Sequence, residues 1–145
     1  MIRQPDVLPV LLAACPSFRE RWEEYLRESG DEDRGVYLDA AEFAHYIVDS
    51  YRCGQTEDLR AAFGAIEAIL ADADEDARGL VIVGVLETVQ NNASHEPFGP
   101  DVFLPWLGPR AREAWASLEQ LWAGKNSLAD VIRAQQVARG RGSKA

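Results

Sequence analysis

The chain has 145 residues and a formal net charge of −9, from 24 acidic and 15 basic side chains. Its hydrophobic content of 47% is enough for the core of one globular domain and excludes wholesale disorder. So acidic a chain is poorly suited to bind nucleic acid or an anionic membrane surface. Its two cysteines are too few for a disulfide framework and fit a reducing cytoplasm.

The chain opens with a short apolar run, Val7 to Ala14, which contains a proline and follows a single basic residue. A secretory signal needs a cationic start and a longer unbroken apolar stretch, so we expect no signal peptide here. No run reaches the roughly 20 apolar residues of a membrane span. Ser17 is expected to open the next helix, and a polar loop is expected over residues 29–36.

Helical spacing of apolar residues dominates the middle of the chain. Asp39 is expected to cap a helix that runs to about Cys53 and stops at Gly54. Thr56 can cap the following helix, which is expected to run to Ala73. The apolar stripe of that helix comprises Leu59, Ala62, Phe63, Ile66, Ile69 and Leu70.

A further helix is predicted directly afterwards, from Asp74 to Asn92. Its centre, residues 80–86, reads LVIVGVL, a β-branched run that also fits a buried strand. The cap that Asp74 offers and the continuation of the pattern through Val89 favour a buried helix. Because almost no loop separates the two helices, residues 56–92 are expected to form a helical hairpin. Its turn, with Asp74 followed by Arg78, resembles the turn of a HEAT repeat.

The last third of the chain begins with a turn-rich connector over residues 91–100. Residues 100–107 are expected to form a short helical turn that Pro105 disturbs. A complete stripe at i, i+3, i+4 and i+7 predicts a helix from Pro109 to Trp122, with Gly124 just past its end.

These elements predict an all-α fold, a compact bundle of about six to eight helices with the HEAT-like hairpin at residues 56–92. Residues 1–124 are expected to form a single acidic helical domain. Residues 125–145 are expected to form a C-terminal helix, which Ser127 can cap and which runs to about Arg139, and a basic flexible tail.

Acidic side chains are concentrated in one part of the chain. Residues 20–76 hold 17 acidic and 5 basic side chains, whereas residues 125–145 hold one acidic and five basic. A dense acidic segment speeds the encounter with a basic partner protein, although an acidic surface that only keeps the protein soluble explains it as well. The acidic residues expected to contact such a partner are Glu23, Glu24, Asp31, Glu32, Asp33, Glu57, Asp58, Asp72, Asp74, Glu75 and Asp76.

Two further features are candidates for partner contact. Asn91, Asn92 and His95 follow the buried helix, which would hold their backbone in place, although a helix C-cap rich in Asn explains them equally well. Trp106 lies in the turn FLPWLGP, from which an aromatic side chain can anchor an interface. The other tryptophans lie on or beside apolar stripes and are expected to pack between helices.

No arrangement of residues that would carry chemistry is complete. Glu42 and His45 stand at i, i+3 on one helical face, as in di-iron bundles, but the second copy of that pair is missing. The spacing of Cys15, Cys53 and the two histidines matches no zinc module. The chain also lacks a nucleophile elbow and a glycine-rich phosphate loop. We therefore expect no catalytic residues, no metal and no cofactor.

The chain resembles a family of small bacterial proteins of uncharacterised function over about Val7 to Ala123. The resemblance lies in five segments, LLAACPSFRERWEEYL, YLDAAEFAHYIVD, LRAAFGAIEAILADADEDAR, GVLETVQN and FLPWLGPRAREAWASLEQLW. It implies an all-helical fold and suggests the acidic immunity proteins that are encoded beside polymorphic toxins. It carries no catalytic residues over to this sequence.

The leading hypothesis is a non-catalytic, cytoplasmic protein–protein interaction module of the immunity or antitoxin type, which masks a basic partner with its acidic face. The alternative is a helical adaptor that docks a peptide or helix in an apolar groove, with Trp106 at the contact. A weaker alternative is a metal-dependent enzyme that uses Glu42 and His45. A homodimer is compatible with these hypotheses, and nucleic acid and membrane are not expected as partners.

Overall fold

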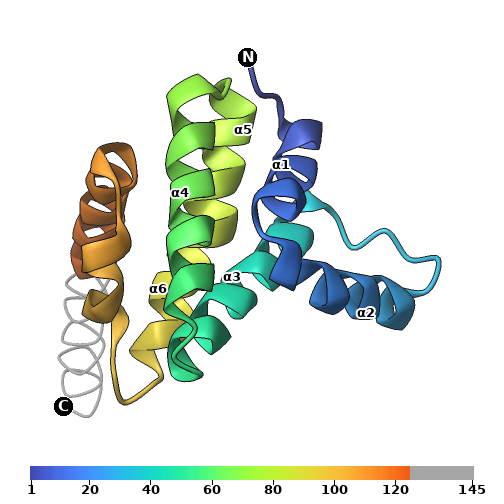
Figure 1. Ribbon diagram of the computed structural model, residues 1–145. Helices are drawn as coiled ribbons and strands as arrows, with labels where there is room; N and C mark the ends of the chain where they lie inside the picture. Colours follow the sequence, from blue (N-terminus) through green and yellow to red (C-terminus); the bar gives the residue numbers. More distant parts are fainter. Residues whose placement is uncertain (125–145) are drawn as a thin grey trace, which may run out of the picture.

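The computed structural model describes residues 1–124, which fold into helices joined by short loops and contain no named strand (Figure 1). The prediction of an all-α fold is confirmed. The predicted helix capped by Ser127 and the basic tail lie outside the described residues. In chain order the elements are η1 (Gln4–Asp6), α1 (Val7–Ala14), η2 (Pro16–Phe18), α2 (Arg19–Ser29), α3 (Val36–Arg52), α4 (Thr56–Asp72), α5 (Glu75–Gly79), η3 (Leu80–Glu87), α6 (Thr88–Ser94), η4 (Pro100–Trp106) and a last helix over residues 109–124.

The centre of the molecule is α4 together with the antiparallel segment that returns beside it through α5, η3 and α6 (Figure 1). Backbone angles stay in the right-handed helical region at Leu80 and at Thr88, so residues 75–94 form one continuous helix. The prediction of a helix over residues 80–86, against a strand, is confirmed. Its middle section, η3, is a π-helix, a wider form that apolar periodicity does not predict.

The turn between α4 and α5 is held by contacts from three sides. The Asp74 carboxylate accepts the backbone N–H of Ala77 at 2.9 Å, which confirms the predicted cap. The Arg78 guanidinium donates to the backbone carbonyl of Leu70 across the turn, at 3.4 Å. At the N-terminus, Ile2 forms a parallel β-bridge with Ala73. The start of the chain is thereby tied to this turn.

A close helix crossing joins α3 to η3. At Gly84 a Cβ atom would lie 2.8 Å from the Cβ of Ala40, closer than real contacts allow, so the crossing requires glycine. The core spreads from this crossing between the helices, because their apolar stripes face one another. Its largest fully buried aromatic side chains are Trp115, Phe18, Phe43, Phe63 and Phe103.

Three predicted helix starts are wrong by one to four residues. Asp39 does not cap α3, because the helix already begins at Val36 after Gly35, whose φ of 87° suits glycine. The Asp39 carboxylate instead accepts a hydrogen bond from the Tyr25 hydroxyl at 2.8 Å. Thr56 is the first residue of α4 and not its cap. Ser17 lies inside η2, where its hydroxyl pairs with that of Tyr46. In each case a neighbouring residue, Phe18, Gly35 or Gln55, takes the N-cap position without a side-chain hydrogen bond.

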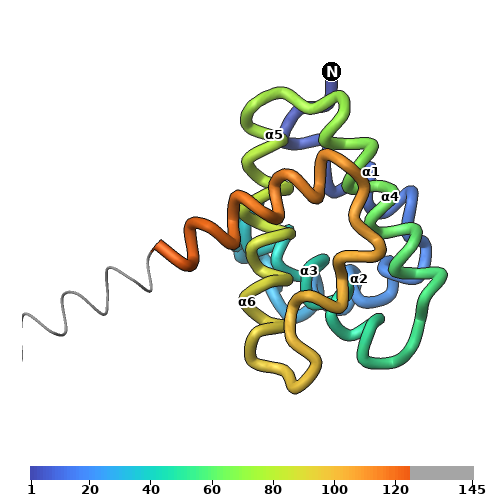
Figure 2. Tube along the Cα trace, turned by 90° about the vertical axis from the view of Figure 1, so that its left-hand side faces the viewer, coloured from blue at the N-terminus to red at the C-terminus, as the bar shows by residue number. Residues whose placement is uncertain are grey.

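The last helix crosses the segment formed by α5, η3 and α6 (Figure 2). The predicted helical turn before it is confirmed as η4, which includes Pro105. The helix continues through residue 124, so the predicted end at Trp122 with Gly124 as a stop is wrong. One glycine costs a helix only about 1 kcal/mol relative to alanine, which does not end it.

Candidate functional site

The acidic candidates do not form one cluster. Glu57 and Asp58 begin α4, whereas Asp72 ends it, about 22 Å away at 1.5 Å per residue. That separation exceeds the Debye length of about 8 Å at physiological ionic strength, so the two ends act independently. Three groups result: Glu23, Glu24, Asp31, Glu32 and Asp33 on α2 and its loop; Glu57 and Asp58 at the start of α4; Asp72, Asp74, Glu75 and Asp76 at the α4–α5 turn.

Several of these acids already have local partners. The Glu57 carboxylate lies 2.9 Å from the guanidinium of Arg60, and that of Asp72 lies 3.8 Å from the N-terminal ammonium group. Within residues 1–124, Glu23 and Glu32 form no ion pair, and both are exposed. The α2 group therefore keeps more unneutralised charge than the group at the start of α4.

The two histidines, 50 residues apart in sequence, line one polar cleft of about 380 Å³. His45 comes from α3 and His95 directly follows α6. Asn92 also lines this cleft, so two of the three predicted polar residues at the end of α6 reach it. The third, Asn91, lines a neighbouring cavity of about 480 Å³, to which His95 also belongs. His95 thus lies between two cavities.

A chain of ion pairs runs through the polar cleft and joins α2, α3 and the segment after α6. Arg21 reaches Glu42 at 2.9 Å and Asp49 at 2.6 Å. Arg52 pairs with Asp49 and with Glu96. Burial lowers the pKa of Arg21, but its hydrogen bonds to the two carboxylates outweigh this and raise that pKa. The sequence analysis missed Arg21, Asp49, Arg52 and Glu96, because single charged residues on separate helices show no common spacing.

This network restricts the chemistry that Glu42 and His45 can perform. The Nδ1 atom of His45 is 3.7 Å from one Glu42 oxygen, while the other oxygen accepts a hydrogen bond from Arg21. Among the described residues, no group of three or more His, Cys, Asp or Glu side chains is arranged to hold a metal ion. Cys15 is buried. Burial raises the pKa of its thiol to about 11, which keeps the thiol protonated. Most of the charged side chains that line the cleft are thus paired with one another.

Trp106 is half-buried and not fully presented to solvent. Its ring packs edge-on against Tyr51, with ring centres 6.3 Å apart. Trp106 also lines a groove of about 550 Å³, together with Phe63 and Glu67 of α4. The predicted anchor is therefore partly used in the packing of η4 against α3.

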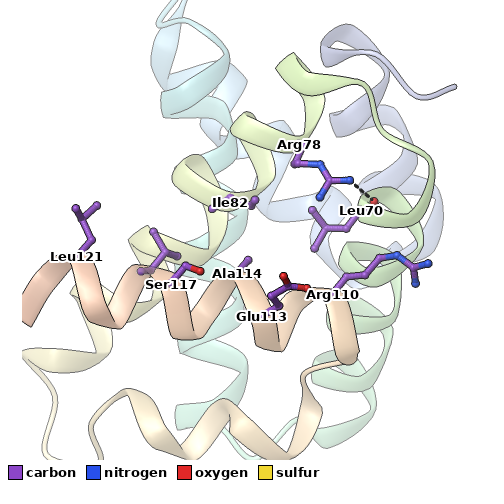
Figure 3. Close-up of a pocket in the computed structure, with 9 residues that line it drawn as sticks. Leu70, Arg78, Ile82, Arg110, Glu113, Ala114, Ser117 and Leu121 are labelled. Carbon is purple, nitrogen blue, oxygen red and sulfur yellow. Dashed lines mark hydrogen bonds between the residues drawn. The ribbon is translucent and has the colours of Figure 1, made fainter.

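A second groove, of about 480 Å³, lies where the last helix crosses α4, α5 and η3 (Figure 3). Leu70, Ile82 and Leu118 contribute apolar surface, and Arg78 and Arg110 lie at one end. Within residues 1–124, Arg78 forms no ion pair with a carboxylate, and its guanidinium donates a hydrogen bond to the Leu70 carbonyl. Sequence spacing does not reveal this groove, because two segments far apart in sequence, residues 70–82 and 110–121, build it.

Comparisons with known proteins place the chain in a family. No helix among residues 1–124 has both the length and the apolar content needed to cross a membrane. No curated protein and no solved structure matches the chain. The family model described as a domain of unknown function, DUF7674, matches residues 8–123. The expected resemblance over residues 7–123 is thereby confirmed as to an uncharacterised family, and the chain belongs to the DUF7674 family.

Proposed function

We propose that this chain is a non-catalytic interaction module, an immunity or antitoxin-type protein of the bacterial cytoplasm, which masks a basic surface of a partner protein. The observation that carries the proposal is the acidic arm, defined as residues 19–35, which comprises α2 and the loop to α3. It holds seven acidic and four basic side chains and extends away from the central helices (Figure 1). Projection from the body leaves its outer side chains open to a partner.

Three of the four basic residues in the acidic arm are already engaged. Arg21 is turned toward carboxylates of α3, and Arg27 pairs with Glu24. Arg34 lies over the ring of Tyr25, with its guanidinium carbon 5.4 Å from the ring centre. The acidic side chains that remain unpaired give the arm a negative electrostatic potential. Such a potential raises the rate of encounter with a basic surface.

The first experiment is capture of a partner from a lysate of the host at low and at high salt. The proposal expects one stoichiometric basic protein, retained at low salt and weakened at high salt. Its association rate is then measured with the variant Glu23→Lys/Glu32→Lys, which should slow association about tenfold or more at low salt. The matched control, Glu75→Lys/Asp76→Lys, makes the same charge change at the α4–α5 turn and should slow it far less.

Two outcomes would contradict the proposal that the acidic arm masks a basic partner. If both double variants slow association equally, net charge and not the acidic arm controls binding. If the captured partner is retained equally at low and high salt, masking by charge is wrong.

A second candidate is the helical adaptor that docks a peptide or helix, which the groove of Figure 3 favours. Its apolar surface and the unpaired Arg78 suit an apolar segment with an acidic end. This function expects binding that is nearly independent of salt, and loss of it in Arg78→Ala. The antiparallel hairpin with Asp74 and Arg78 at its turn is consistent with the proposed HEAT-like character of residues 56–92.

A metal-dependent enzyme built on Glu42 and His45 is the weakest proposal. Only the contact between these two side chains supports it. Elemental analysis of the purified protein tests it directly: a stoichiometric transition metal that is lost in His45→Ala would support it, and a metal-free protein with full partner binding would remove it.

A further inference from the structure

Large apolar side chains are exposed where α3 begins beside η3. The apolar patch, defined as Tyr37, Leu38 and Val83, has exposed fractions of 46%, 56% and 46%. With Trp122 of the last helix, these residues line a cleft of about 370 Å³. Single exposed apolar residues are ordinary, but a group from separate elements around one cleft marks an interaction site.

The Tyr37 side chain of the apolar patch packs along α5 and η3. Its hydroxyl oxygen lies 3.7 Å from the position that a Cβ of Gly79 would occupy, and its ring carbon Cδ1 lies 3.5 Å from the corresponding position at Gly84. These are ordinary contact distances, so the Tyr37 ring lies directly against this segment. The π-helix η3, which carries Val83, is a rare conformation that occurs frequently at functional sites.

One acidic side chain lines the cleft of the apolar patch, and another precedes Tyr37 by four residues along the chain. Glu87 of η3 lines the same cleft. Asp33, in the acidic arm, accepts the backbone N–H of Gly35 at 2.9 Å, directly before α3 begins. The nearby Arg34 is directed to Tyr25, and no basic residue of the described chain lines this cleft. An apolar centre with an acidic rim complements a segment that presents apolar and basic side chains together.

We infer that the apolar patch binds a basic amphipathic helix of the partner protein. Apolar side chains of that helix would cover Tyr37, Leu38 and Val83, and its lysines or arginines would lie against Asp33 and Glu87. This inference rests on the proposed function, because it names the element of the basic partner that is bound. It adds an apolar contact, which the charge of the acidic arm alone does not provide.

The test uses a helical peptide of about four turns, with leucines at i, i+3, i+4 and i+7 and lysines on the remaining face. Its scrambled isomer has the same composition and charge but no apolar face. The full chain should bind the amphipathic peptide about tenfold or more tightly than the isomer. The variant Leu38→Gln/Val83→Thr should weaken that binding about tenfold, and Leu121→Gln, at a 51% exposed leucine of the last helix outside this cleft, should leave it within about twofold.

Hydrogen exchange locates the contact: the peptide should protect amides at the start of α3 and along η3. Equal binding of both peptides, or equal loss in the patch and Leu121 variants, would overturn the inference while leaving charge-driven partner binding intact. Absence of peptide binding would also overturn it, and capture of the natural partner would still test the proposed function separately.

Protection of the same amides in the peptide-free chain, beyond that of the other helical amides, would also overturn the inference. Protection that depends on protein concentration would identify a second copy as the occupant. Protection independent of concentration would identify the chain's own residues 125–145, which hold five basic side chains and one acidic.

Discussion

Glu67, in the middle of α4, caps the last helix at Arg110, which lies 43 residues further along the chain. Its Oε1 atom accepts the backbone N–H of Arg110 at 2.9 Å, and its Oε2 atom accepts that of Ala111 at 3.0 Å. The carboxylate thus serves two backbone donors that a helix start leaves unsatisfied. A Cβ atom at Gly108 would lie 2.6 Å from the Glu67 carboxyl carbon, so glycine at this position permits the approach.

This long-range cap predicts coupled effects of Glu67 and Gly108. Glu67→Ala should lower the free energy of unfolding by about 2 kcal/mol, because two backbone donors lose a charged acceptor. Gly108→Ala should lower it by about 1–2 kcal/mol by displacing that carboxylate. The double variant should cost less than the sum of the two, as measured by a urea-unfolding double-mutant cycle. Strictly additive losses would show that the two residues act separately.

The close crossing of α3 and η3 predicts opposite effects at two helical glycines. Gly84→Ala should lower the free energy of unfolding by about 1–3 kcal/mol, because its Cβ would press against Ala40. Gly64→Ala is the control: it lies in α4 with nothing within 4 Å of the added atom, and it should raise that free energy by about 0.5–1 kcal/mol. Chemical denaturation of both variants measures the difference. A stabilising Gly84→Ala would contradict the crossing.

The ion pairs of the polar cleft predict that Arg21 attaches α2 to the body. Arg21→Ala should cost about 1 kcal/mol of unfolding free energy, since partial exposure screens its two ion pairs. It should also increase hydrogen exchange of α2 amides more than elsewhere. Arg27→Ala, which removes only an exposed pair within α2, is the control and should leave α2 exchange unchanged. Equal exchange in both variants would show that apolar packing alone holds α2.

The buried thiol predicts a loss of stability at alkaline pH. Burial raises the pKa of Cys15 to about 11, from 9.0 for an exposed thiol. The unfolded chain therefore releases the thiol proton first, and stability declines as the pH rises from about 9 to about 11. The difference in unfolding free energy between the wild type and Cys15→Ala should shrink by about 2 kcal/mol over that range. Tyr25, whose pKa burial and Asp39 also raise, is common to both proteins and cancels.

Thiol labelling provides an independent check of the same burial. In the native protein at pH 8, a disulfide reagent should react quickly with exposed Cys53 and only slowly with Cys15. Denaturant should equalise the two rates. Rapid labelling of both thiols without denaturant would show that α1 opens readily.

Local patterns were sufficient to predict most of the fold. The stripes around Leu59 and Trp115 each place apolar residues at helical spacing, and both helices form. The Asp74 cap could also be predicted, because its partner Ala77 is three residues away. The start at Val36 could not, because Gly35 with a positive φ, and not a capping side chain, precedes it. The start at Pro109 was predicted from the sequence, but its cap by the distant Glu67 was not.

The candidate sites depended on tertiary structure to a greater extent. Sequence spacing could show that Glu42 and His45 share a helical face. It could not show that Arg21 would donate a hydrogen bond to the Glu42 carboxylate. It could count the acids of residues 20–76, but not their division among the acidic arm and the two ends of α4. Likewise, Tyr37 and Val83 each fit an ordinary apolar position of a helix, so the sequence does not show that they lie exposed around one cleft.

The amino-acid sequence by itself determined the all-helical class, the negative charge and the hairpin turn at Asp74, because these follow from contacts within a few residues or from composition. Only the tertiary structure decided the capping of residue 110 by Glu67, the pairing of both histidines in one cleft and the exposure of the apolar patch. Those features join side chains more than 40 residues apart, and the packing of α3 and α4 against their neighbours determines which of them meet.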